Sequence, residues 1–219
     1  MEGHPEDIVP CLRCSNCYHI SSDHWNVGCS VNPRYHHQEF VPSEINLPKA
    51  ETKKHVVILG GGPAGMKAAI TASDRGHKVT IIEKQKELGG MLRFISKEAH
   101  KEEVQRLLDY YLTQIFKREI EVLLNTEADP ELVKELQPDS LLIAFGAVER
   151  ILPIPGVEGE KVQLATKAIA HPEQLGQNIV ILGGGSIGCE IGLELAENGK
   201  NVTILELTDT LAANANSLY

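Results

Sequence analysis

The sequence of 219 residues has no long hydrophobic run and no block of basic residues. Its longest mainly apolar stretch, residues 178–189, ends at Glu190 and is shorter than the roughly 18 residues of a transmembrane helix. The 21 Lys and Arg residues form no stripe and are outnumbered by 30 Asp and Glu residues, so we expect no binding to nucleic acid or to an anionic membrane. The acidic, proline-containing N-terminus is not a secretory signal peptide. We therefore expect a soluble cytoplasmic protein.

The composition also lacks the biases of non-globular proteins. Hydrophobic residues make up 42% and charged residues 23% of the chain, which has 19 glycines and 11 prolines. These values exclude disorder, collagen and coiled coil. The length corresponds to roughly one and a half domains.

Cysteine is scarce, but it is unevenly placed. Cys11, Cys14, Cys17 and Cys29 have the spacing C-x2-C-x2-C-x11-C, whereas Cys189 lies alone in an apolar segment and is interpreted as helix packing. Without a secretory signal, closely spaced cysteines indicate metal ligands rather than disulfides. Structural zinc is typically held by two separated pairs, whereas an iron–sulfur cluster accepts three close thiolates and a distant fourth. The spacing favours an iron–sulfur cluster and leaves zinc, or no metal, as alternatives.

A glycine-rich loop lies between an expected strand and an expected helix in the first half of the chain. Residues 54–59 predict a buried parallel strand, residues 66–75 a helix, and residues 78–82 a second strand that ends at Glu83. The loop reads Gly60-Gly61-Gly62-Pro63-Ala64-Gly65. This pattern is typical of a dinucleotide site, where glycines let the backbone approach a pyrophosphate and the acid accepts a hydrogen bond from a ribose hydroxyl.

The same pattern recurs 123 residues later. Residues 177–182 predict a strand, residues 189–198 a helix, and residues 201–205 a strand that ends at Glu206, with the loop Gly183-Gly184-Gly185-Ser186-Ile187-Gly188 after the first strand. The first glycine and the acid are 23 residues apart in both copies. Two such units beside a cysteine cluster indicate binding of a flavin and a nicotinamide nucleotide. A carboxylate at position 206 would repel a 2′-phosphate, which favours NADH over NADPH.

The segment between the two loops completes the first nucleotide-binding domain. Residues 104–115 have the apolar spacing of an amphipathic helix, and residues 120–124 alternate as a strand. Pro130 begins a short helix, and residues 140–144 predict another buried strand. We therefore expect an α/β fold of Rossmann-like FAD/NAD(P)-binding units behind an irregular, cysteine-rich N-terminal arm.

These features, in this order, resemble the multidomain flavin oxidoreductases of the 2,4-dienoyl-CoA reductase, enoate reductase and trimethylamine dehydrogenase type. The resemblance covers essentially the whole chain. It rests on residues 7–14, 29–33, 60–65, 88–92, 153–157 and 183–190. It implies an iron–sulfur cluster arm and linker, the first part of an FAD-binding domain, a crossover, and an incomplete NAD(P)H-binding βαβ unit. These segments are residues 1–50, 51–152, 153–176 and 177–219.

The resemblance also assigns site residues. By this resemblance, the ligands of a [4Fe-4S] cluster would be Cys11, Cys14, Cys17 and Cys29. The FAD site would be lined by Gly60, Gly62, Pro63, Ala64, Gly65, Glu83, Lys84, Gly90 and Leu92, with the adenine beside the backbone of Ala128. The NAD(P)H site would be lined by Gly183, Gly185, Ser186, Ile187, Gly188 and Glu206. No catalytic residue is expected, because hydride transfer to a flavin needs no acid or base from this chain.

Proteins of this family also carry an N-terminal (β/α)8 barrel that holds FMN and the substrate. The sequence begins after the position of that barrel and ends within the second nucleotide-binding domain, so we expect a truncated fragment that is not fully active alone. It would pass electrons from NAD(P)H through FAD and the cluster to FMN in the missing barrel, its expected partner, which reduces an activated C=C bond. The oligomeric state is left open. Two alternatives are a module resembling the glutamate synthase small subunit and a non-enzymatic, zinc-stapled nucleotide-binding module.

Overall fold

The computed structural model describes residues 3–18, 28–43 and 46–213. The chain divides into two compact units, of which the first comprises Met1–Ser96 and Glu102–Ala147, and the second Lys97–Lys101 and Val148–Tyr219. The four functional segments expected from the sequence stay a prediction. Within the described ranges, no helix is both long and apolar enough to cross a membrane.

In the described part of the first unit, four parallel strands form a sheet in the order β3-β2-β1-β4. Their bounds are β1 His55–Leu59, β2 Lys78–Ile82, β3 Ile120–Leu123 and β4 Ser140–Ile143. Parallel strands need crossover connections, which are supplied by α1 (Pro63–Asp74), α2 (Leu92–Ile95), α3 (Glu102–Phe116) and α4 (Pro130–Leu136). The strand order reverses beside β1, which creates a topological switch point between β1 and β4, where α/β proteins bind ligands.

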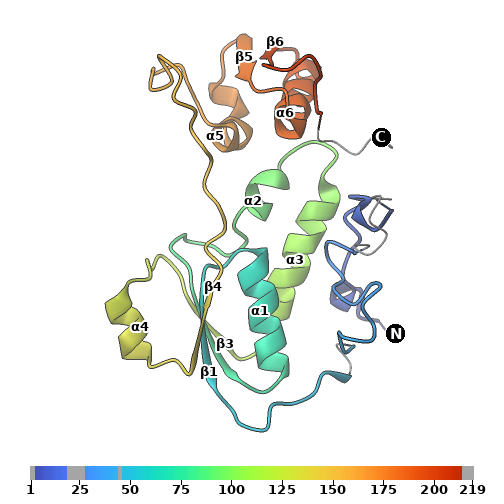
Figure 1. Cartoon of the computed structure of the whole chain (residues 1–219), viewed down its shortest axis with the longest axis vertical. Helices are drawn as coiled ribbons and strands as arrows, with labels where there is room; N and C mark the ends of the chain where they lie inside the picture. The colour runs from blue at the N-terminus through green and yellow to red at the C-terminus, as the bar shows by residue number, and fades with distance from the viewer. Residues whose placement is uncertain (1–2, 19–27, 44–45, 214–219) are drawn as a thin grey trace. The chain divides into compact units, whose positions relative to one another are not determined.

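Helices cover both faces of this sheet, with α1 and α3 on one side and α4 on the other (Figure 1). On the first face, Ile58, Met66 and Ile81 are fully buried. On the second face, Val57 packs in a cluster that includes Leu132 of α4. Burial on both faces explains why the central strands are continuous apolar runs in the sequence. The α/β class expected from the sequence is therefore confirmed.

The strand β4 corrects one expectation. The apolar run at residues 140–144 predicts a buried strand, but Leu141, Leu142 and Ile143 are 44%, 38% and 66% exposed. β4 is the edge strand of the described sheet and pairs with β1 alone. An apolar run identifies the strand correctly, but it does not report which faces neighbouring elements cover.

The second unit contains a smaller strand–helix–strand repeat. Its described strands, β5 (Asn178–Leu182) and β6 (Asn201–Leu205), pair in parallel and are joined by α6 (Ser186–Glu197). The short helix α5 (Ala165–Ala170) precedes them. Residues along both strands alternate between half-buried and exposed, because α6 packs on one face of the pair while the other face leaves Val180 60% exposed.

The N-terminal arm is held on α3 by polar contacts. The buried side chain of Gln114 donates from Nε2 to Asp7 Oδ1 at 2.7 Å. Lys117 Nζ lies 2.7 Å from Asp7 Oδ1 and 3.1 Å from Glu6 Oε1. Both acids belong to the 3-10 helix Pro5–Asp7, so these contacts fix the start of the arm on the first unit.

Replacement of Lys117 with Met should raise the pKa of Glu6. Hydrogen bonds from the backbone, from His4 and from Lys117 lower that pKa from 4.5 to about 2. The stabilisation from this ionised group is therefore complete above pH 4.5 and is lost as the pH falls through about 2. An NMR titration of the Glu6 carboxyl measures the change, and Lys134→Met on α4 is the matched control. An unchanged Glu6 midpoint in Lys117→Met would show that this ion pair does not form.

Candidate functional site

The first glycine loop leads directly from β1 into α1. Gly60 has a φ of +107°, and a Cβ at this position would lie 2.3 Å from the carbonyl oxygen of Ala144, just after β4. A Cβ at Gly65 would lie 1.9 Å from the carbonyl oxygen of Gly60. Glycine is therefore required at Gly60 for the turn and at Gly65 for the close approach of the helix to the strand.

Gly62, by contrast, faces open space. It immediately precedes α1, and the nearest atom to an added Cβ is Gly90 Cα at 4.0 Å. Pro63 occupies the first helical position, where its lack of a backbone N–H costs no intrahelical hydrogen bond. The N–H groups of a first helical turn have no intrahelical partner and carry partial positive charge. The start of α1 thus offers an anion site with room for a phosphate group.

Glu83 closes this loop from the end of β2. Its carboxylate accepts hydrogen bonds from the N–H of Gly61 at 2.7 Å and of Gln85 at 2.8 Å, and the residue is only 7% exposed. Each carboxylate oxygen has a second lone pair, so Glu83 keeps acceptor capacity toward a ribose hydroxyl. We call this arrangement of glycine loop, helix start and acid the first cradle.

The loop of the second unit repeats this geometry, and we call it the second cradle. Gly183 has a φ of +106°, and a Cβ at Gly188 would lie 2.0 Å from the carbonyl oxygen of Gly183. The N–H of Gly184 donates to Glu206 at 2.7 Å, as Gly61 does in the first cradle. The repeat detected in the sequence is therefore a repeat of backbone geometry, down to the hydrogen bond that links loop and acid.

The remaining residues of the second cradle are open to a ligand. A Cβ at Gly185 would meet no atom within 4 Å, as expected for close approach of a phosphate. Ser186 begins α6, and Ile187 beside it is 66% exposed. No Lys or Arg follows Lys200 in the sequence. A 2′-phosphate beside Glu206 would therefore find no cation on the segment that carries this acid.

Glu206 differs from Glu83 in accepting an additional hydrogen bond from a side chain. The N–H of Thr208 donates to it at 2.9 Å, as that of Gln85 does to Glu83, and the hydroxyl of Thr208 is the additional donor at 3.1 Å. Hydrogen bonds from the backbone of Thr208 and of Gly184, followed by the Thr208 hydroxyl, lower the pKa of Glu206. The carboxylate is thus held ionised and oriented, which suits an acceptor of ribose hydroxyls.

Sequence reasoning missed the residues that hold the two acids. Gln85 and Thr208 each follow their acid by two residues, and each donates a backbone N–H to it. Gly89 and Ala212 lie further along, and their N–H groups donate to the carbonyls of the second glycine of each loop at 2.8 and 2.7 Å. These donors follow both acids at the same spacing, so a comparison of the two repeats could have identified them.

Other residues assigned to the FAD site lie around the first cradle. A Cβ at Gly90 would lie 3.0 Å from Gly62 Cα, so the turn at residues 88–91 reaches the loop. Leu92 is buried at the start of α2, and Lys84 is exposed beside the acid. Ala128 packs against the core cluster beneath β1 and β2. Contact of these residues with a cofactor stays a prediction.

The cysteine-rich arm brings its near and distant cysteine segments together. Cys14 Sγ lies 3.2 Å from the hydroxyl oxygen of Ser30, the residue directly after Cys29. The N–H of Arg13 donates to Cys11 Sγ at 3.4 Å. The segment that carries Cys14 thus lies beside the segment that carries Cys29.

The four clustered cysteines are free thiols, of which three are exposed and Cys29 is half-buried. Within the described residues, the one group of three metal-ligating side chains whose ligand atoms lie within 4.8 Å of one another is His4, Glu6 and Asp7. This group is exposed and takes part in the contacts that hold the arm on α3. The irons of a cluster are distributed over its corners, so its thiolates need not converge as they do on a single ion. Four thiols fit either an iron–sulfur cluster or zinc.

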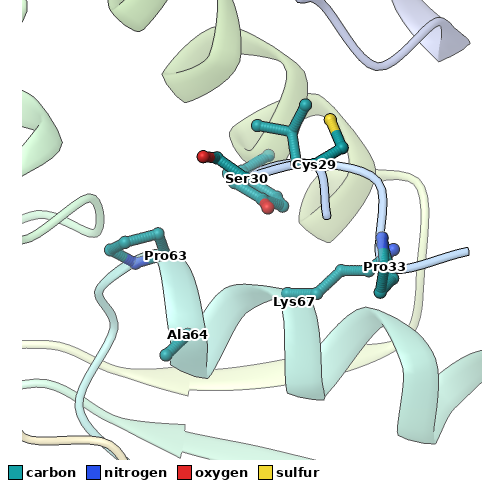
Figure 2. Close-up of a pocket in the computed structure, with 8 residues that line it drawn as sticks. Cys29, Ser30, Pro33, Pro63, Ala64 and Lys67 are labelled. Atoms are coloured by element: carbon teal, nitrogen blue, oxygen red, sulfur yellow. The ribbon is translucent and has the colours of Figure 1, made fainter. Parts of the chain in front are cut away.

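A pocket of about 270 Å³ lies between the cysteine arm and the start of α1 (Figure 2). Cys29 and Ser30 line one side, and Pro63, Ala64 and Lys67 of α1 line the other. The arm also contributes apolar side chains to the main core cluster, namely Val9, Leu12 and Val31. The cysteine site and the first cradle are therefore parts of one compact unit.

A parallel α/β fold with two glycine cradles of this geometry defines a class of dinucleotide-binding oxidoreductases. The family model for pyridine nucleotide-disulphide oxidoreductases matches residues 54–217. The chain belongs to this family, and FAD and NAD(P)H binding follow from that membership.

Three relatives refine this membership. Cinnamate reductase from Clostridium sporogenes is 37% identical over 207 residues, which cover 94% of this chain and 30% of that protein. NADH oxidase from Thermoanaerobacter brockii is 37% identical over 219 residues, which cover 96% of this chain and 33% of that protein. The structure of 2-naphthoyl-CoA reductase in complex with 2-naphthoyl-CoA aligns with a TM-score of 0.88 and 33% identity over 98% of this chain and 32% of that one. The chain spans about a third of these relatives, and the enoate-reductase-type resemblance is confirmed.

The two kinds of glycine in the first cradle should respond differently to alanine. Gly65→Ala should lower the free energy of unfolding by about 3 kcal/mol, because its methyl group would overlap the carbonyl oxygen of Gly60. Gly62→Ala should change it by less than about 0.5 kcal/mol, because the site is open. It should nevertheless weaken FAD binding at least about tenfold, since the methyl group occupies the space for a phosphate. Urea unfolding and flavin fluorescence titration measure the two effects. If Gly62→Ala bound FAD as tightly as the wild type, the first cradle would not be the FAD site.

Proposed function

We propose that this chain is the electron-input segment of a larger flavoenzyme. It would carry electrons from NAD(P)H, through FAD and a [4Fe-4S] cluster, to an FMN-containing barrel domain that reduces an activated C=C bond. The observation that carries the proposal is the packing of the cysteine arm and the first cradle in one compact unit. Relatives named as reductases of cinnamate and of 2-naphthoyl-CoA support a reductase, and their greater length supports a further domain as partner.

FAD is proposed to occupy the first cradle. Gly62 leaves room for its pyrophosphate, the start of α1 supplies N–H donors, and Glu83 accepts from a ribose hydroxyl. When bound, the flavin accepts a hydride and releases single electrons, which connects a nicotinamide with a one-electron carrier. The residues of this chain bind and orient the cofactors, so we assign no catalytic side chain.

The cluster is proposed to be held by Cys11, Cys14, Cys17 and Cys29. The 3.2 Å contact between Cys14 and Ser30 supports this set, because it brings the distant ligand segment beside the near one. The position of Cys29 across a pocket from the start of α1 supports a cluster near the FAD-binding unit. Metal analysis distinguishes this cluster from the alternative, a module in which the same cysteines hold zinc.

NADH is proposed as the electron donor at the second cradle. The oriented, ionised carboxylate of Glu206 is an acceptor for both ribose hydroxyls and repels a 2′-phosphate. Residues 201–206, the segment that ends at this acid, contain no Lys or Arg that would offset the repulsion. The proposed selectivity for NADH thus rests on Glu206.

Glu206→Ala should raise the ratio of kcat/KM for NADPH to that for NADH by about tenfold or more. The variant loses a charge-assisted hydrogen bond to the ribose and the repulsion of a 2′-phosphate at once. Steady-state kinetics of the intact parent enzyme measure the ratio, with Glu197→Ala on α6 as the matched control. An unchanged ratio would show that Glu206 is not the ribose ligand.

Cys14→Ala should abolish the visible absorbance of the cluster in anaerobically purified protein and leave bound FAD at the wild-type level. Cys189→Ala is the matched control, because it also removes one thiol. That thiol lies in α6, outside the cysteine arm, and donates to the carbonyl of Gly184. Visible spectra and iron analysis of both variants are compared with the wild type. If Cys14→Ala alters thermal stability alone, the cluster and the proposed electron path are wrong.

A further inference from the structure

Ser30 is the hydroxyl-bearing neighbour of the cysteine site. Its Oγ lies 3.2 Å from Cys14 Sγ, a distance typical of a hydrogen bond to sulfur. Its neighbour Val31 packs against the main core cluster, and Cys29 and Ser30 both line the pocket beside α1. Figure 2 shows Ser30 on the loop that crosses above the first turns of α1. The hydroxyl is therefore presented to the cysteine by a supported loop.

The direction of this hydrogen bond depends on the state of the thiol. A free Cys14 thiol and the Ser30 hydroxyl each carry one proton, so either can donate. A cysteine that ligates metal is a thiolate, which has no proton and can only accept. In the loaded protein the Ser30 hydroxyl must therefore be the donor.

We infer that Ser30 is a positioning residue that raises the reduction potential of the cluster through the thiolate of Cys14. This inference rests on the proposed function, since it requires the cluster. Reduction adds negative charge to the cluster and its sulfur ligands, and a donor aimed at a ligand sulfur stabilises the reduced form more than the oxidised form. The effect makes the cluster a better acceptor of electrons from the flavin.

A backbone donor at the same site gives a useful contrast. The N–H of Arg13 donates to Cys11 Sγ and is retained in every side-chain variant. The Ser30 hydroxyl, in contrast, belongs to a side chain and can be removed without altering the peptide chain. The hydrogen bond to the cysteine site that a substitution can remove is therefore the one from Ser30, on the loop that also carries Cys29.

The test is an anaerobic redox titration of the cluster in Ser30→Thr and Ser30→Val, followed by visible and electron paramagnetic resonance spectra. The two side chains have the same shape and differ in the hydroxyl group. Ser30→Thr should keep the wild-type potential, whereas Ser30→Val should be more negative. We expect about a tenfold lower ratio of reduced to oxidised cluster at a fixed potential, which corresponds to about 59 mV for one electron. Ser43→Ala in the same arm should leave the potential unchanged.

Iron and FAD content are measured on the same samples and should be equal in all variants. Equal potentials in Ser30→Thr and Ser30→Val, with the cluster intact, would overturn the role of Ser30 and leave the proposed function standing. A wild-type protein that contains zinc or no metal would overturn both. Loss of iron in both variants would show that Ser30 is needed to build the site rather than to set its potential, and would also overturn the inference.

Discussion

The close approach of a helix to the strand before it is the constraint on which both nucleotide sites depend. At Gly65 and at Gly188 a methyl group would lie about 2 Å from the carbonyl oxygen of the first glycine of the loop, so only glycine fits at this position in the first turn of each helix. That approach aims the start of each helix at the carboxyl end of the sheet, where its unpaired N–H groups can meet phosphate. The acid at the end of the next strand then reaches back to the loop, through Gly61 in one cradle and Gly184 in the other.

The same constraint explains why the sequence was informative about this part of the molecule. Glycine spacing reflects backbone constraints inside each strand–loop–helix unit, such as the positive φ at Gly60 and the contact of Gly65 with Gly60, so these residues and their counterparts could be assigned roles from the sequence. The sequence pattern predicts both helix starts about three residues late, because the last residues of each loop form the first helical turn, as Pro63 does in α1. The pattern does not predict the short helices α2 and α5, since neither is long enough to show a period.

Features that depend on distant segments could not be predicted in the same way. The exposure of Ile143 reflects the position of β4 at the edge of the described sheet, which no local pattern encodes. The anchoring of the arm by Gln114 joins residues more than a hundred positions apart. The approach of Ser30 to Cys14 likewise depends on how two loops pack, whereas the cysteine spacing alone left iron and zinc both open.

The first cradle and the cysteine arm have different roles in the proposed function. In the proposed function, the nucleotide-binding fold would hold the flavin that accepts a hydride, and a cluster on the cysteine arm of the same compact unit would accept single electrons. The chain spans about a third of its relatives, so we propose that the acceptor of those electrons and the residues that select the substrate belong to a further domain.

The proposed electron path is tested most directly by the metal and flavin content of one anaerobically purified sample of the chain. An electron-input segment should contain about four irons per chain together with bound FAD. About one zinc per chain and no flavin would contradict it, and would leave a nucleotide-binding module stapled by a structural metal.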